Sequence, residues 1–186
     1  ADRDPRVLRA AGEAAFRTGA FPESARYFAR ALARSTDPHD TAELAVNEAL
    51  ALANAGDERA ALERLTRRGL TDAETSALAA LALAARVTAD TEPERACTFL
   101  ERLVQRAPDS AAERIELAGC YLARDRPADA IAVLAHPTVD ADPRGLFQRA
   151  LAVDLAQGLA VSFPRYEQVA DAGCAEALLN LGLVHR

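Results

Sequence analysis

The side chains that most often carry catalysis or bind metals are few and scattered in this chain of 186 residues. None of its three histidines lies in an HExxH motif or a comparable arrangement of metal ligands; they are His39, His136 and His185. The three cysteines are far apart and form no CxxC pair, so they encode no zinc motif. We therefore expect no catalytic residues and no metal site.

Cofactor chemistry is also missing from the sequence. All 22 basic residues are arginine, so the chain has neither a Schiff-base lysine nor a phosphate-binding P-loop lysine. It contains no G-x-S-x-G turn for a nucleophilic serine and no G-x-G-x-x-G loop for a dinucleotide. The sequence therefore predicts a protein that is not an enzyme and that binds no cofactor.

The charge balance argues against two further classes of partner. Asp and Glu number 28, which gives a net charge of −6, and the arginines form no basic stripe, so we expect no nucleic acid binding by this segment. No apolar run approaches the roughly 20 residues of a membrane span, so we expect no membrane insertion. A cytoplasmic location follows as the expectation, or a periplasmic one if a leader was removed before Ala1.

The composition favours helices. Alanine (45 residues) and leucine (24) dominate, whereas the β-branched valine and isoleucine together number only 12. Alanine and leucine are strong helix formers, and sheets depend on β-branched residues. The sequence therefore predicts an all-helical protein.

Three columns of residues recur along the chain with one common set of intervals. Their spacings begin 37, 35 and 34 residues, which indicates an array of repeats. The Gly12 column contains Gly12, Ala49, Ala84 and Ala118; the Ser24 column contains Ser24, Ala61, Ala96 and Ala130; the Phe28 column contains Phe28, Leu65, Leu100, Leu134 and Ala170. Within each repeat the apolar spacing predicts two amphipathic helices. Pro22, Pro93, Pro127 and Pro164 are expected at the starts of second helices, where the missing N–H is not needed.

These residues resemble the tetratricopeptide repeat (TPR) family, whose unit is about 34 residues long. The positions that carry the resemblance are Leu8, Gly12, Gly19, Ala25, Phe28 and Ala31, then Gly56, Asp57, Ala61 and Leu65, then Ala96, Leu100 and Pro108, then Leu117, Tyr121, Ala130 and Leu134. Glu48 departs from the pattern, because it stands where the family packs a large apolar residue. The segment 166–182 looks more like a Sel1-type helix pair.

The resemblance implies a right-handed α-α superhelix of about five helix pairs plus a terminal helix, in a single domain over 1–186. We expect repeats at 5–38, 41–72, 73–108, 110–140 and 142–173, with a partial repeat at 175–186. The last helix, with Leu178, Leu181 and Val184, lacks a second helix to cover it. We therefore expect a segment of a longer protein, or self-association through this C-terminal helix.

Transferring the family's groove positions residue by residue gives a partner-binding surface on the first helices. Its members are Arg6, Arg9, Glu13, Arg17, Val46, Asn47, Leu50, Asn54, Leu81, Ala85, Ile115 and Leu122. The resulting groove would be cationic at one end and apolar in its middle. A different superhelical twist would instead turn the apolar members into the core, and one sequence does not fix that twist.

The resemblance therefore implies a non-enzymatic protein interaction scaffold that binds a peptide or partner helix in its concave groove. Two other readings stay open. One is a ligand-sensing regulatory domain of a bacterial transcription regulator, and the other is a periplasmic scaffold of an envelope polysaccharide or protein export machine.

Overall fold

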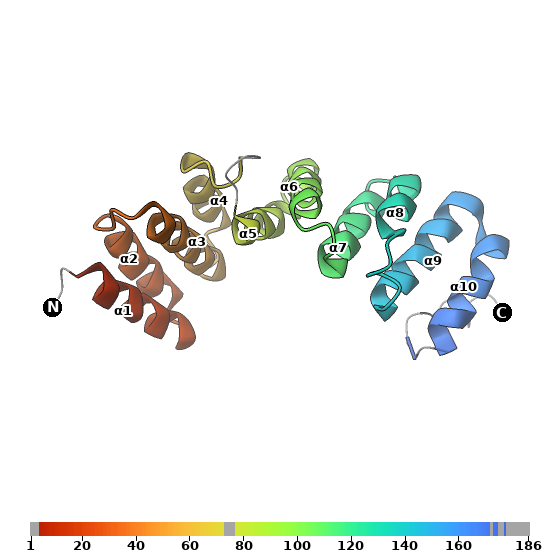
Figure 1. Cartoon of the computed structure of the whole chain (residues 1–186), viewed down its shortest axis with the longest axis horizontal. Helices are drawn as coiled ribbons and strands as arrows, with labels where there is room; N and C mark the ends of the chain where they lie inside the picture. The colour runs from red at the N-terminus through yellow and green to blue at the C-terminus, as the bar shows by residue number, and fades with distance from the viewer. Residues whose placement is uncertain (1–3, 73–76, 172, 175–176, 178–186) are drawn as a thin grey trace. The chain divides into compact units, whose positions relative to one another are not determined.

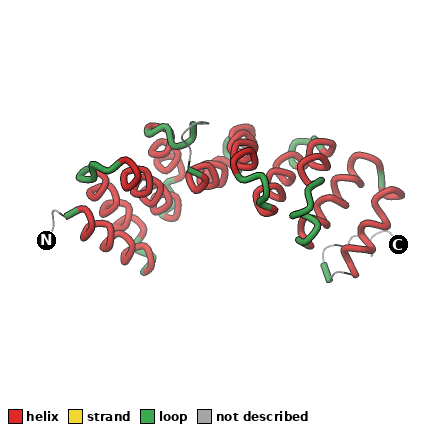
Figure 2. Tube along the Cα trace, in the orientation of Figure 1, coloured by secondary structure: helices red, strands yellow, loops and turns green. Residues whose placement is uncertain are grey.

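The computed structural model describes residues 4–72, 77–171, 173–174 and 177, and every regular element among them is an α-helix (Figures 1 and 2). Ten helices lie within the described residues: α1 (Pro5–Arg17), α2 (Phe21–Leu32), α3 (Pro38–Asn54), α4 (Glu58–Arg67), α5 (Leu78–Thr88), α6 (Pro93–Arg106), α7 (Ala111–Leu122), α8 (Pro127–Leu134), α9 (Pro143–Gln157) and α10 (Leu159–Asp171). The all-helical prediction is confirmed. No helix in the described ranges has the length and apolar character to cross a membrane.

The chain divides into two compact units, residues 1–102 and 103–186. In the first unit each helix from α1 to α5 packs against the next, and α3 also contacts α5. In the second unit α7 to α10 pack in the same sequential way, and α7 also contacts α9. Each unit is thus built from neighbours in sequence, as in a repeat protein.

The three columns meet where two helices come close together. Gly12 on α1 faces Phe28 on α2 so closely that a Cβ at Gly12 would lie 2.9 Å from the ring atom Cε1. The hydroxyl of Ser24 donates a hydrogen bond of 2.8 Å to the Gly12 carbonyl oxygen. All three residues are buried. A small residue on the first helix therefore permits a large one on the second.

The second unit repeats this packing with other residues. Ala118, Ala130 and Leu134, one from each column, belong to one buried apolar cluster. The remaining members of the Gly12 and Ser24 columns are also buried, as are Leu65 and Leu100. Phe28, Leu65, Leu100 and Leu134 are therefore all core residues.

Several helix starts depend on an aspartate followed by a proline. Asp4, Asp37 and Asp142 are the N-cap residues of α1, α3 and α9, and each side chain accepts a hydrogen bond from a backbone N–H in the first turn. The proline that follows each occupies a position that needs no N–H donor. Ser110, by contrast, precedes α7 but makes no capping hydrogen bond with its side chain.

The start of α10 differs from the expectation. The sequence places Pro164 at the beginning of a second helix, but α10 begins at Leu159 and Pro164 lies inside it. Only Gly158, with φ of 86°, separates α9 from α10. A positive φ is readily adopted by glycine, so the chain reverses in one residue. Pro164 is the sixth residue of α10, so the helix lacks the hydrogen bond that an N–H there would donate to the Ala160 carbonyl oxygen.

Two expectations lie outside the described residues. Of the partial repeat expected at 175–186 the structure describes only residue 177, so Leu178, Leu181 and Val184 lie outside the described residues, and the Sel1-like segment is described only in part. Both stay predictions, as do the repeat boundaries.

Glu48 is a buried acid on α3, with 3% of its surface exposed. Its Oε1 lies 3.0 Å from Nη2 of Arg64 on α4. Within the described residues, neither its Oε2 nor the Nε of Arg64 has a hydrogen-bond partner. Burial raises the pKa of the Glu48 carboxyl above its usual value, against the opposing charges of Arg64 and Arg68. Glu48 is thus an incompletely compensated charge in the first unit.

The packing at Gly12 predicts a cost for one added methyl group. Gly12→Ala should lower the free energy of unfolding by about 1 to 3 kcal/mol, because the Phe28 ring must move. Gly119→Ala on α7 is the matched control, since a Cβ there would lie 3.5 Å from Nε2 of Gln148, an ordinary contact. This control should leave stability unchanged or raise it by up to about 1 kcal/mol. Equal effects of the two substitutions in urea unfolding would contradict this account of the columns.

Glu48 predicts a specific pH dependence. Its raised pKa means that the folded chain holds the proton to a higher pH than the unfolded chain, whose Glu pKa is about 4.3. The stability that Glu48 contributes is therefore fully present below about pH 4.3, the pKa of the unfolded chain. It is lost as the pH rises through the pKa of Glu48 in the folded chain. Relative to Glu48→Gln, the wild-type free energy of unfolding should fall as the pH rises above about 4.

Urea unfolding followed by circular dichroism at several pH values measures this difference. Glu63→Gln is the control, because Glu63 is also paired with an arginine, Arg67, but is exposed. As the pH rises, the wild type should lose more stability relative to Glu48→Gln than relative to Glu63→Gln. A pH trend in Glu48→Gln that parallels the wild type would refute the role given to this carboxyl.

Candidate functional site

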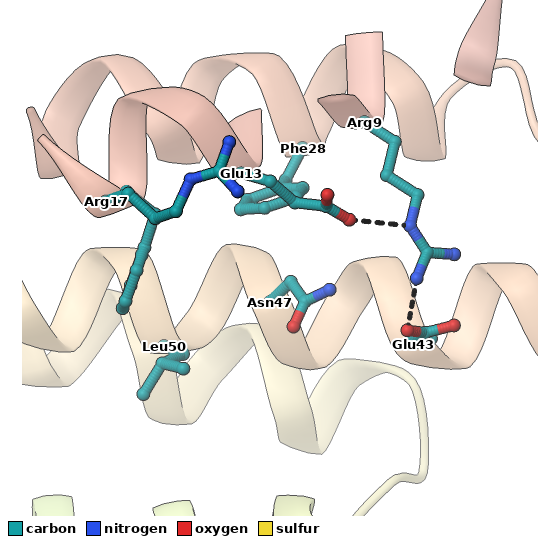
Figure 3. Close-up of a pocket in the computed structure, with 8 residues that line it drawn as sticks. Arg9, Glu13, Arg17, Phe28, Glu43, Asn47 and Leu50 are labelled. Atoms are coloured by element: carbon teal, nitrogen blue, oxygen red, sulfur yellow. Dashed lines mark hydrogen bonds and ion pairs between the residues drawn. The ribbon is translucent and has the colours of Figure 1, made fainter. Parts of the chain in front are cut away.

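A cleft of about 340 Å³ opens on the first unit, between side chains of α1, α2 and α3 (Figure 3). It is lined by Arg9, Glu13, Phe16 and Arg17 from α1, Phe28 from α2, and Glu43, Asn47 and Leu50 from α3. Its volume lies within the range of about 300 to 1,000 Å³ typical of ligand pockets.

Five of the predicted groove residues line this cleft: Arg9, Glu13, Arg17, Asn47 and Leu50. Arg6 and Asn54 are exposed but do not line it, and Val46 is half-buried beside it on α3. The Asn54 amide instead donates a hydrogen bond to the Leu50 carbonyl oxygen at 2.7 Å.

The apolar members further along the chain lie in the packed interior. Leu81 and Ala85 on α5 are 0% and 4% exposed, and Ile115 on α7 is 5% exposed. Leu122 is half-buried and packs against the apolar cluster of the second unit. Helix α5 carries no charge before Arg86; it buries Leu81 and Ala85 and exposes the face with Leu78, Ala82 and Arg86. We therefore place the candidate site in the cleft and leave these four side chains out of it.

An ion-pair triad closes one end of the cleft. Nε of Arg9 donates to Oε1 of Glu13 at 3.0 Å, and Nη2 of Arg9 pairs with Oε1 of Glu43 on α3. The hydrogen bonds that Arg9 donates to Glu13 and Glu43 raise the pKa of Arg9. Two carboxylates thus surround one guanidinium, and this end does not carry the free positive charge that the sequence suggests.

Sequence analysis missed three lining residues of the cleft: Phe16, Phe28 and Glu43. Glu43 lies 34 residues after Arg9, whereas the first interval of the columns is 37 residues, so it stands about one helical turn before Val46, the position equivalent to Arg9. The repeat interval alone therefore does not predict this pair.

The rest of the cleft has polar groups that can still form hydrogen bonds or ion pairs. Arg17 is exposed and makes no ion pair with any described residue, and Figure 3 shows its side chain extending along the cleft. Asn47 has no side-chain hydrogen bond to the described part of the chain, so its amide can still donate and accept. Between them lie apolar groups: Phe28, Leu50, and Phe16, whose ring packs edge-on against Phe21 at 5.2 Å.

The side chains of this cleft can bind a ligand through hydrogen bonds and apolar contacts. Across residues 4–72, 77–171, 173–174 and 177, no group of three or more His, Cys, Asp or Glu side chains could hold a metal ion. His136 lies between α8 and α9, and its Nδ1 is 2.9 Å from Oγ1 of Thr138. The cleft offers apolar side chains, an amide, and the guanidinium of Arg17, which has no ion-pair partner among the described residues.

Comparisons with known proteins agree with this fold. Residues 88–153 match the family model described as "Tetratricopeptide repeat". No curated protein matches the chain.

Solved structures of repeat proteins superpose on most of the chain. A crystal structure of MamA protein gives a TM-score of 0.75 at 16% identity, covering 90% of each chain. A tetratricopeptide repeat protein from Parabacteroides merdae gives 0.78 at 13% identity, covering 90% of this chain and 66% of that one. TPR-like repeats of a putative kinesin light chain from Podosopora anserina give 0.69 at 22% identity, covering 90% and 95%.

At these identities the structures establish the fold, and the family model places the repeat motif within residues 88–153. The chain is therefore a helical solenoid of the tetratricopeptide repeat type.

Proposed function

We propose that this chain is a protein interaction scaffold that binds a peptide or partner helix in the cleft between α1 and α3. The observation that carries the proposal is the composition of the cleft: exposed polar groups with unused hydrogen-bonding capacity surround apolar side chains. Tetratricopeptide repeat arrays typically hold protein partners on the surface formed by their first helices, and α1 and α3 are first helices in our repeat assignment.

Asn47 is the group best suited to a peptide backbone. Its amide carries two donors and one acceptor and can bond both the N–H and the C=O of a bound segment. Leu50 lies on the same face of α3, three residues further on. A ligand whose main chain meets Asn47 would therefore place an apolar side chain against Leu50.

Arg17 would orient the ligand. Because the Arg9 charge is taken up by Glu13 and Glu43, Arg17 is the cation in the cleft that can receive an acidic group. Burial of one leucine side chain contributes about 1.5 to 3 kcal/mol, and an exposed ion pair about 0 to 1. The apolar contact should therefore set the affinity, and Arg17 the orientation and the rate of association.

A displayed library of random peptides, selected on the immobilised full chain, tests this function. Enriched peptides should bind the purified chain in fluorescence anisotropy, and Leu50→Glu should weaken a set of them at least about tenfold. Asn47→Ala should weaken the same peptides, since the main chain loses its partner.

Asn54→Ala is the matched control, because Asn54 is exposed on the same helix but does not line the cleft. It should leave affinity unchanged, and circular dichroism should show equal helicity in all three variants. Peptides that bind Leu50→Glu and Asn47→Ala as tightly as the wild type would place binding elsewhere. Failure to enrich any peptide would argue against a peptide-binding scaffold.

A further inference from the structure

The second unit has a cleft of its own, which the proposed function does not use. It has a volume of about 490 Å³ and is formed by α8, α9 and α10. Its lining residues are Ile131, Arg149, Val153, Pro164, Arg165 and Gln168. They include two guanidinium groups and no carboxylate, although the chain as a whole carries a net charge of −6.

The two arginines differ in how they are held. Nη1 of Arg149 lies 2.7 Å from Oδ1 of Asp140, in the connection before α9, and this pair fixes the position of Arg149. Arg165 makes no ion pair within the described residues, and its Nη1 donates to the Val161 carbonyl oxygen at 3.2 Å. A guanidinium has five N–H donors, so both arginines keep donors for another acceptor.

Apolar groups line the same cleft. Ile131 and Val153 contribute aliphatic side chains from α8 and α9, and Pro164 contributes its ring from α10. Val161, four residues before Arg165, lies on the same face of α10 and is 44% exposed. Large hydrophobic side chains with this much exposure are few among the described residues. The early start of α10 at Leu159 brings Val161 into this helix.

We infer that this cleft binds an acidic peptide segment that carries an aliphatic side chain. Charge complementarity selects the acidic partner, because planar guanidinium groups bind carboxylates through two parallel hydrogen bonds. The aliphatic wall selects an apolar residue next to the acidic one, and the volume exceeds what a single carboxylate would fill. The site belongs to the second unit and does not depend on the cleft of the first.

The library selection is repeated on the full chain with Leu50→Glu, which blocks the first cleft, to test this site separately. We expect enriched peptides that contain Asp or Glu beside Leu, Ile or Val. Arg165→Glu should weaken their binding at least about tenfold in anisotropy. Replacing the acidic residue of the peptide by Gln or Asn should weaken binding to a similar degree, and raised salt should reduce the difference.

Arg144→Glu is the matched control, because Arg144 is an exposed arginine of α9 that does not line the cleft. It should leave the affinity unchanged. Arg165 is exposed, so its substitution should not disturb folding, and Gln168→Glu gives a second test at another exposed lining position. Acidic peptides that bind the Arg165→Glu chain unchanged, or a selection that enriches none, would overturn the inference.

Discussion

The fold depends on how closely the two helices of a pair can approach. At Gly12 the backbone of α1 comes so near the Phe28 ring that a Cβ would collide with it, and Ser24 bonds the same stretch of backbone. Ala118, Ala130 and Leu134 occupy the corresponding positions in the second unit. Interiors pack at the density of organic crystals, so a small residue opposite a large one sets both the spacing and the register of the pair. Both clefts rest on helices placed by this contact.

Charge placement depends on which face of a helix carries the charge. Arg9 on α1 pairs with Glu43 on α3, although they are 34 residues apart and the first column interval is 37. This pair, together with Glu13, neutralises one end of the first cleft, whereas Arg17 makes no ion pair with any described residue. Glu48 shows the opposite situation, because it is buried and its Oε2 has no hydrogen-bond partner among the described residues. Acidic residues of α3 can therefore neutralise a surface arginine or destabilise the core, depending on the face that carries them.

The sequence predicted the helices and the core well, because both depend on periodicity. Phe28, Leu65, Leu100 and Leu134 recur at one interval, and all are buried. Five of the residues that line the first cleft were also predicted, because the same register assigns a face to each helix.

The errors arose where periodicity carries no information. Leu81 belongs to α5, which carries no charge before Arg86, so the residues around Leu81 do not distinguish its buried face from its exposed one. Pro164 was assigned to a helix start from its residue type alone, whereas the positive φ of Gly158 allowed α10 to begin five residues earlier. The second cleft combines side chains from three helices, so no periodic pattern within one helix predicts it.

The single-residue connection at Gly158 also governs how this region can change over time. The other connections contain several residues; the one between α8 and α9 spans residues 135–142 and buries Val139 in the core. Insertions in such connections can extend outward without moving the helices on either side. At Gly158 an added residue, or a side chain that resists positive φ, must instead rotate α10 against α9. Natural variants of this protein should therefore differ in length at the longer connections and keep the α9–α10 corner constant in length.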